Sequence, residues 1–147
     1  MIFSEAKTGR TFVIRLEDGD VIHEKIEEFA KENNIRAAYF NALGGVDKGS
    51  ILITGPVEGR GDSVVPMYYT LEEVFEAQGT GTLIPEENSD STVHMHLSCG
   101  RKEKTITGCI RSGVKVWHVM EIVLTELLES SAMRKPDKVT GFNLLIP

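Results

Sequence analysis

The sequence lacks a cysteine framework, a long apolar run and an excess of positive charge. Its 147 residues include only two cysteines, Cys99 and Cys109, which are too few for a disulfide-based scaffold. No apolar stretch approaches the length of about eighteen residues that a membrane-spanning helix needs. The first residues, MIFSEAKTGR, show no basic segment followed by an apolar run, as a signal peptide would. We therefore expect a cytoplasmic protein that does not associate with membranes.

The charge balance is acidic, with 16 Lys and Arg residues against 22 Asp and Glu residues and a formal net charge of −6. An acidic surface repels the phosphate backbone of nucleic acids. Basic residues gather only at Arg101, Lys102 and Lys104, which Glu103 interrupts, and at Arg134 with Lys135. Non-specific nucleic-acid binding by the whole surface is therefore disfavoured.

The length and the hydrophobic content of 41% favour one domain spanning residues 1–147. Apolar residues recur at helical spacing from Ile22 to Ala30, and Asp20 is a plausible N-cap for this amphipathic helix. Most other segments are typical of strands, seven or eight in all, and 66–79 is predicted as a single strand. The C-terminal tail is expected to hold a short turn and a final extended piece. This pattern predicts an α+β domain with a mostly antiparallel β-sheet.

Two of the four histidines lie in one short strand, TVHMHLSC. Alternate side chains of a strand point to the same face, so His94 and His96 share a face, with Cα atoms roughly 6.6 Å apart. Val93, Met95 and Leu97 point to the other face. Two imidazoles at this spacing could converge on one metal ion. The alternative is a pair of half-exposed histidines that bond only to backbone or water.

A third donor could come from either of two later strands. In the returning strand TITGCIR, Cys109 shares the histidine face if polar face meets polar face, although a slip of one residue would reverse it. Alternatively Cys109 is a small buried apolar residue. His118, on the strand VKVWHVMEIVLTEL, is in phase with Val116 and Met120, so it is either a ligand or a buried core histidine.

Several segments together resemble the PPC (plants and prokaryotes conserved) domain family in its free-standing prokaryotic form, over roughly residues 9–143. They are VIRLEDGDVIHEKIEEFAKENNIRAAYFNALGGV, GTGTL, VHMHLSCGRKEKTITGCI, VWHVMEIVL and TGFNLL. The resemblance implies an α+β fold that assembles as a homotrimer, and it places Asn41 near the histidine strand as a candidate pocket residue. Glu121 matches a common family glutamate, which we interpret as structural or as part of an interface.

The resemblance also bears on the metal site. Many family members have Gly-Gly-His where this chain has Thr107-Gly108-Cys109, so one family histidine is replaced by Cys109. We therefore predict a Zn²⁺ site made by His94, His96 and His118, with Cys109 as the alternative third ligand. Three protein ligands would leave a position open for water or a small-molecule ligand.

Three functions compete. The first is a zinc-binding homotrimer with a small-molecule pocket near the metal. The second is a metal-dependent hydrolase or lyase, for which the only candidate general bases are Glu72, Glu73 and Glu76. The third is a DNA- or transcription-associated interaction module, like the plant domains that follow AT-hook segments. The segment EGRGDS has Arg-Gly-Asp where an AT-hook needs Arg-Gly-Arg-Pro, so DNA binding is not expected here.

Overall fold

The computed structural model describes residues 1–60, 64–87 and 90–147. Residues 61–63 of the segment EGRGDS and residues 88–89 of the polar loop before the histidine strand lie outside this range. The described residues form one helix, α1 (Ile22–Glu32), and ten strands. The strands are β1 (Lys7–Glu17), β2 (Ala38–Val46), β3 (Ile51–Pro56), β4 (Pro66–Thr70), β5 (Phe75–Pro85), β6 (Ser91–Arg101), β7 (Lys104–Cys109), β8 (Val116–Leu128), β9 (Met133–Pro136) and β10 (Asn143–Ile146).

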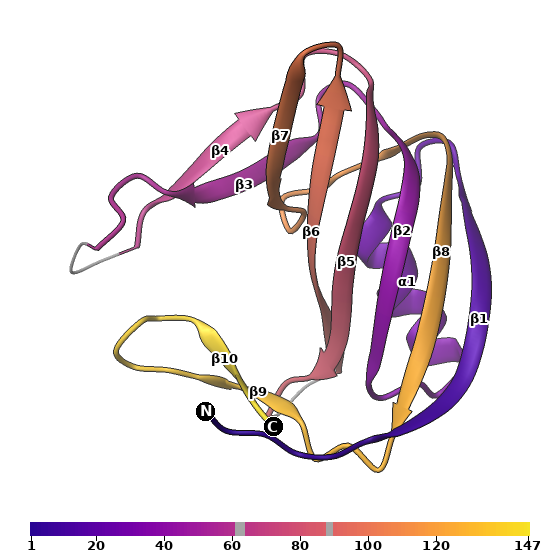
Figure 1. Ribbon diagram of the computed structural model, residues 1–147, viewed down its shortest axis with the longest axis vertical. Helices are drawn as coiled ribbons and strands as arrows, with labels where there is room; N and C mark the ends of the chain where they lie inside the picture. Colours follow the sequence, from indigo (N-terminus) through magenta and orange to yellow (C-terminus); the bar gives the residue numbers. More distant parts are fainter. Residues whose placement is uncertain (61–63, 88–89) are drawn as a thin grey trace.

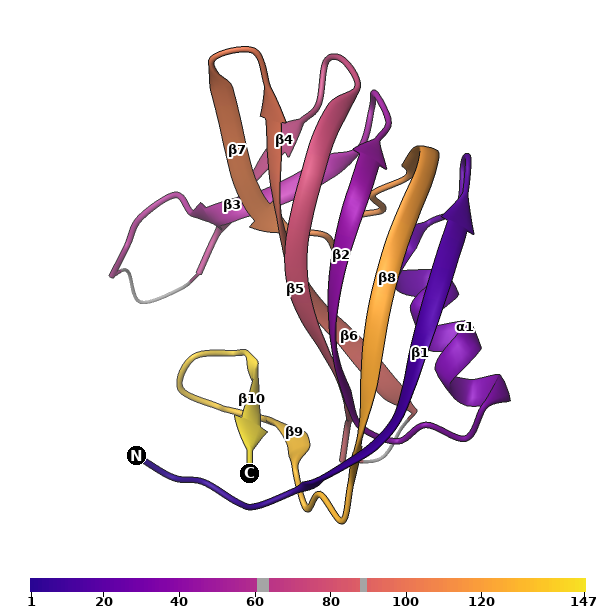
Figure 2. The same cartoon turned by 45° about the vertical axis from the view of Figure 1, so that its right-hand side comes forward.

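Eight strands form one antiparallel sheet in the order β1-β8-β2-β5-β6-β7-β3-β4 (Figure 1). The C-terminal tail forms a separate hairpin of β9 and β10, which lies beside the lower end of β5 (Figures 1 and 2). The prediction of an α+β fold with a mostly antiparallel sheet and one helix is confirmed. The strand number is larger than predicted because the tail pairs with itself and because 66–79 is not one strand.

The interruption of 66–79 has a simple cause. Leu71 is fully buried, and it exchanges backbone hydrogen bonds with the turn after β2, donating to Ser50 and accepting from Gly49. This anchors the chain between β4 and β5 to a different part of the core, so the two strands cannot continue into each other.

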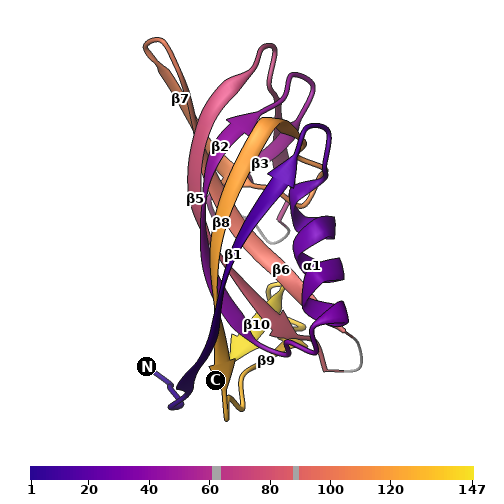
Figure 3. The ribbon, with the colours of Figure 1, turned by 90° about the vertical axis from the view of Figure 1, so that its right-hand side faces the viewer.

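Helix α1 covers one face of the sheet (Figure 3). Its spaced apolar residues Ile22, Ile26 and Ala30 are buried in one core cluster with the inward-facing residues of β6. The predicted N-cap is wrong. The helix is preceded by Val21, which offers no side-chain cap, and Asp20 instead accepts a hydrogen bond from the backbone N–H of Glu17. Asp20 therefore closes the turn between β1 and α1. In the described part of the chain, no helix is both long and apolar enough to cross a membrane.

Candidate metal centre

His94 and His96 lie side by side on the face of β6 that points away from α1. The residues between and around them, Val93, Met95 and Leu97, are all buried in the core, as the alternation predicts. Both histidines are exposed, and their ring centroids are 5.2 Å apart at an interplanar angle of 72°. Because the alternate apolar side chains of β6 face the core, the two imidazoles lie together on the opposite face of the strand.

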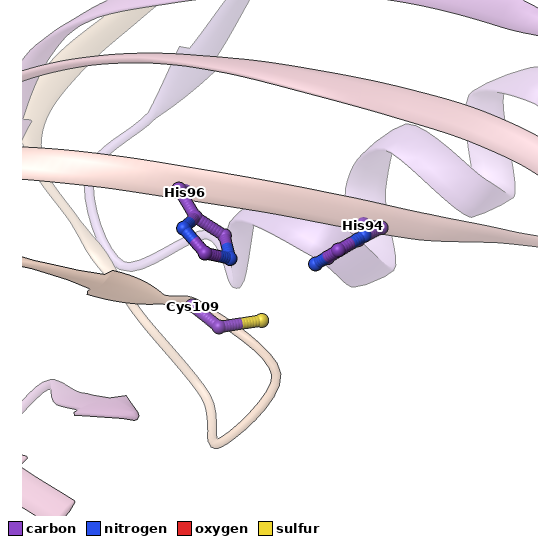
Figure 4. Close-up of side chains that lie close together, drawn as sticks. All are labelled: His94, His96 and Cys109. Carbon is purple, nitrogen blue, oxygen red and sulfur yellow. The ribbon is translucent and has the colours of Figure 1, made fainter. Parts of the chain in front are cut away.

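Cys109 joins this pair from the neighbouring strand. It lies directly opposite His96 in the antiparallel pairing of β6 with β7, so both side chains share a face. One ligand atom from each of His94, His96 and Cys109 lies within 4.8 Å of the other two (Figure 4). A tetrahedral Zn²⁺ would need these atoms about 3.3–3.6 Å apart, given bonds of 2.0–2.3 Å. Small side-chain rotations of His94, His96 and Cys109 can bring the three ligand atoms to these shorter distances.

His118, the preferred third ligand in the sequence prediction, is not part of this group. It is exposed, its backbone N–H donates to Asp18 Oδ1 at 2.7 Å, and its ring lies 4.4 Å from that of Trp117. Strands β2 and β5 separate β8 from β6. Three strand spacings of about 4.8 Å place the two strands roughly 14 Å apart. Within one chain, the geometry assembles the alternative set with Cys109 and not the set with His118.

A local irregularity in β8 explains why His118 departs from the predicted phase, although Val116 and Met120 are buried as that phase predicts. Gly44 pairs with Met120 and Gly45 pairs with Trp117, so the two residues His118 and Val119 face a single step of β2. His118 takes up this extra length with φ of +60°, in the left-handed region. Strict alternation through the bulge would place His118 with the core residues, but the two extra residues, His118 and Val119, are both exposed.

The face around the histidines is polar. Thr80 lies opposite His96 on β5 and donates to Asn41 Oδ1 at 2.9 Å, and Asn41 lies opposite Thr80 on β2. A row of directly paired side chains thus runs across the sheet from Asn41 through Thr80 and His96 to Cys109. Asn41 is on the histidine face, but two strands separate it from Cys109, so it borders the candidate centre and does not complete it.

The surroundings hold His94 in its neutral form. Desolvation by nearby protein atoms, together with the charges of Arg111 and Arg134 and electrostatic coupling to His96, lowers the pKa of His94 to about 4. A neutral imidazole is the form that binds a metal ion, so His94 requires no deprotonation at neutral pH.

The two arginines are functional candidates that the sequence did not single out. Arg134, on β9, donates from Nη2 to Thr82 Oγ1 at 2.9 Å, and Thr82 lies directly opposite His94 on β5. Arg111 follows Cys109 by two residues. Arg134 was seen only as part of a small basic cluster, because nothing in the sequence indicates that the tail folds back onto β5.

The other cysteine and the acidic candidates lie elsewhere. Cys99 is fully buried, and burial raises the pKa of its thiol to about 11, so it remains a protonated core residue.

Glu76 pairs with Gly100, four positions from His96, and Glu72 and Glu73 precede β5. In the described ranges, no carboxylate joins the His94, His96 and Cys109 group. A hollow of about 1020 Å³ lies elsewhere, between α1 and the chain that joins β5 to β6.

Together, the described residues form an antiparallel domain with one helix, and a candidate group of nitrogen and sulfur ligands lies on the face of the sheet opposite that helix. Residues 3–128 match the family model of the Plants and Prokaryotes Conserved (PCC) domain. The chain therefore belongs to this family, as its sequence segments suggested.

Solved structures share the fold. A plant- and prokaryote-conserved (PPC) protein of Pyrococcus horikoshii is 26% identical, with a TM-score of 0.84 over 100% of this chain and 98% of that one. A protein of Archaeoglobus fulgidus, described as metal-containing, is 24% identical, with a TM-score of 0.85 over the whole of both chains. A protein of Bacteroides thetaiotaomicron, named for proposed DNA binding, is 16% identical, with a TM-score of 0.76 over 96% of each chain.

One curated relative is much longer. The bifunctional protein GlmU of Synechococcus sp. (strain JA-3-3Ab) is 27% identical over 136 residues, which are 90% of this chain and 20% of GlmU. The chain thus spans about a fifth of that relative's length.

Proposed function

We propose that this protein binds Zn²⁺ through His94, His96 and Cys109. The observation that carries the proposal is the meeting of three donor atoms within 4.8 Å on one face of β6 and β7. Imidazole nitrogen and thiolate sulfur together suit Zn²⁺, a borderline-soft ion, better than Mg²⁺ or Ca²⁺, which prefer oxygen. Three protein ligands leave a fourth position for water or a small ligand, which suits a binding or reactive centre more than a closed structural one.

Two further observations support a metal at this place. The low pKa of His94 keeps its ring ready to coordinate, and the structurally similar protein of Archaeoglobus fulgidus is described as metal-containing. We also propose that residues 1–147 act as one domain, because the hairpin beyond the matched region places Arg134 beside Thr82 on the same face.

We propose that the protein assembles as a homotrimer through the half of this sheet face formed by β1, β8 and β2. Val13 lies directly opposite Val123, and they are 85% and 49% exposed. Leu43, two residues from Asn41 on the adjacent β2, is 59% exposed. A contiguous apolar area of this kind on an open sheet face indicates an interaction surface. Association there would bring a neighbouring subunit towards the metal centre.

Metal analysis of the purified chain tests the zinc proposal. After Zn²⁺ loading and removal of excess metal, we expect one ion per chain, and a loss of bound metal in His96→Ala. Replacing zinc by Co²⁺ should give the charge-transfer absorption of a cobalt–thiolate bond, which disappears in Cys109→Ser. A wild-type protein that takes up no zinc, or a cobalt spectrum unchanged by Cys109→Ser, would contradict the proposed ligand set.

A second candidate is an interaction module associated with DNA, since two structurally similar proteins are named for proposed DNA binding. The net charge of −6 makes direct DNA contact unfavourable for this chain. A gel-shift experiment with mixed-sequence duplexes at moderate salt distinguishes the two. A salt-dependent shift with the metal-free protein would favour the second candidate over the first.

A further inference from the structure

Arg134 is a buried cation that forms no ion pair within the described residues. Only 5% of the surface of Arg134 is exposed to solvent. Nη2 donates to Thr82 Oγ1, but Nε is buried with no hydrogen-bond partner, and no carboxylate of the described ranges forms an ion pair with it. A buried charge without a counter-ion is costly, because the lost hydration is not replaced. Burial accordingly lowers the pKa of Arg134, and the charge of Arg111 lowers it further.

Arg111 adds a second positive charge at the same place. The backbone N–H of Ile110 donates to the Met95 carbonyl at 3.2 Å, so the pairing of β6 with the returning chain continues past Cys109. Arg111 begins the turn that the Gly113 N–H closes onto the Ile110 carbonyl, and it lies near enough to His94 for its charge to lower the pKa of that ring. Ile110 is fully buried, and Arg111, the next residue, is exposed on the other side, where the histidines lie.

The charges around the candidate centre do not balance. A divalent metal ion and two guanidinium groups would face a single negative ligand, the thiolate of Cys109. The carboxylate of Glu86 also attracts the charge of Arg134, and its Oε1 accepts hydrogen bonds from Thr92 Oγ1 and Asn143 Nδ2. Even with this second negative charge, the positive charges remain in excess. A site with this excess of positive charge attracts a negative ligand, most strongly where protein excludes water.

We propose that the open coordination position and the two arginines form one site for a small oxyanion, with a carboxylate or a phosphate group as the recognised chemistry. One oxygen of the anion would bind the metal, and another would accept hydrogen bonds from Arg134. Arg111, which is exposed, would close the outer side. The planar guanidinium presents paired N–H donors that match carboxylate and phosphate oxygens, and the unpartnered Nε is one such donor. This inference rests on the proposed metal site.

The test is a calorimetric titration of the zinc-loaded protein with acetate in one arm and inorganic phosphate in the other. Wild type is compared with Arg134→Gln, Arg111→Gln and the control Lys135→Gln. Lys135 is the neighbour of Arg134 on β9, but it forms a surface ion pair with Glu87. We expect Arg134→Gln to weaken anion binding by about tenfold or more, since a charge-assisted hydrogen bond is lost. Lys135→Gln should leave it unchanged, and all variants should keep their zinc.

The outcomes separate this proposal from the metal proposal. Equal anion affinity in wild type and Arg134→Gln, or binding of neither anion by the zinc-loaded wild type, overturns the oxyanion site while the zinc site stands. If Arg134→Gln does not fold, Arg111→Gln, at an exposed position, gives the same comparison. If the wild type holds no zinc, the titration is repeated on the metal-free chain. Anion binding that depends on Arg134 would then support the oxyanion site alone, and its absence would overturn it.

The two arms also identify the source of the anion. Preference for acetate indicates a carboxylic-acid ligand, and preference for phosphate indicates a phosphorylated one.

Discussion

Cys109 lies directly opposite His96 in the antiparallel pair of β6 and β7, and this single register contact brings it to His94 and His96 in the candidate metal-binding group. The hairpin that sets the register turns between Arg101 and Lys104, with Lys102 in the left-handed region at φ of +54°. A hairpin longer or shorter by one residue would move Cys109 to the core side of the sheet.

The first prediction concerns this contact. Cys109→Ser should lower the affinity for Zn²⁺ by roughly tenfold or more, since loss of even an outer-shell partner of a zinc ligand has that effect. Competition with a chromophoric chelator measures the affinity. Cys99→Ala is the matched control, because it removes the other thiol, which is fully buried in the core. It should leave the zinc affinity unchanged and lower only the stability.

His118→Ala completes this comparison. Because His118 lies on β8, with its ring against Trp117, its removal should not change the zinc affinity. A loss of affinity in His118→Ala together with normal affinity in Cys109→Ser would restore the ligand set that the sequence favoured.

The second prediction concerns the close contact of β5 with β6 behind the site. A Cβ atom at Gly79 would lie 2.1 Å from the backbone oxygen of His96 and 2.8 Å from Leu97 Cδ2. Gly79→Ala must displace the backbone of β6, so it should lower the free energy of unfolding by about 1–3 kcal/mol or more. Urea unfolding measures the effect. At Gly59 a Cβ would meet open space, so an unchanged midpoint is expected for Gly59→Ala. Equal stability of the two variants would contradict the contact.

The third prediction concerns pH and the ion pair of Arg10 with Glu126. Glu126 is buried and accepts hydrogen bonds from Arg10 Nε at 2.8 Å and from Nη2 at 3.0 Å. These bonds lower the pKa of Glu126 below its usual value of 4.5. A lowered carboxyl pKa contributes stability that is present above the usual value and is lost as the pH falls through the lowered one.

The stability difference between wild type and Glu126→Gln should therefore be largest near pH 7 and shrink towards pH 3. Chemical unfolding at a series of pH values provides the measurement. Glu129→Gln is the control, because the pair of Glu129 with Lys7 is exposed and such pairs contribute little. A difference that grows as the pH falls would contradict the assignment.

The fourth prediction concerns assembly. Val123→Asp should convert the proposed trimer to a smaller species, because it places a charge in the apolar area beside Val13. Size-exclusion chromatography with light scattering gives the mass. Val139→Asp, at a residue 88% exposed between β9 and β10, should leave the trimer intact. A monomeric wild type, or a trimeric Val123→Asp variant, would refute the proposed interface.

Two of the three residues of the candidate site could be predicted from local sequence. The alternation of β6 is sufficient to place His94 and His96 together, because the pleat has a period of two and the apolar residues between them must face the core. The same reasoning identified α1 from its helical spacing. Each of these inferences depends on neighbours only a few residues away.

The third ligand could not be decided in that way. The sequence offered Cys109 and His118 with similar arguments, and the preference went to His118. A bulge opposite Gly44 and Gly45 reverses its expected phase, and the strand order places two strands between β8 and β6. Both are long-range properties that local alternation does not contain.

By itself, the sequence determined the helix, the mostly antiparallel β-structure and the common face of two imidazoles, because hydrophobic burial acts on short periodic patterns. Only the tertiary structure decided that Cys109 meets this pair and that Arg134 returns from the C-terminal tail to lie beside Thr82. The physical reason is that strand register, strand order and the docking of a tail are chosen by the energy of the whole packed chain. Residues distant in sequence become neighbours only once that packing exists.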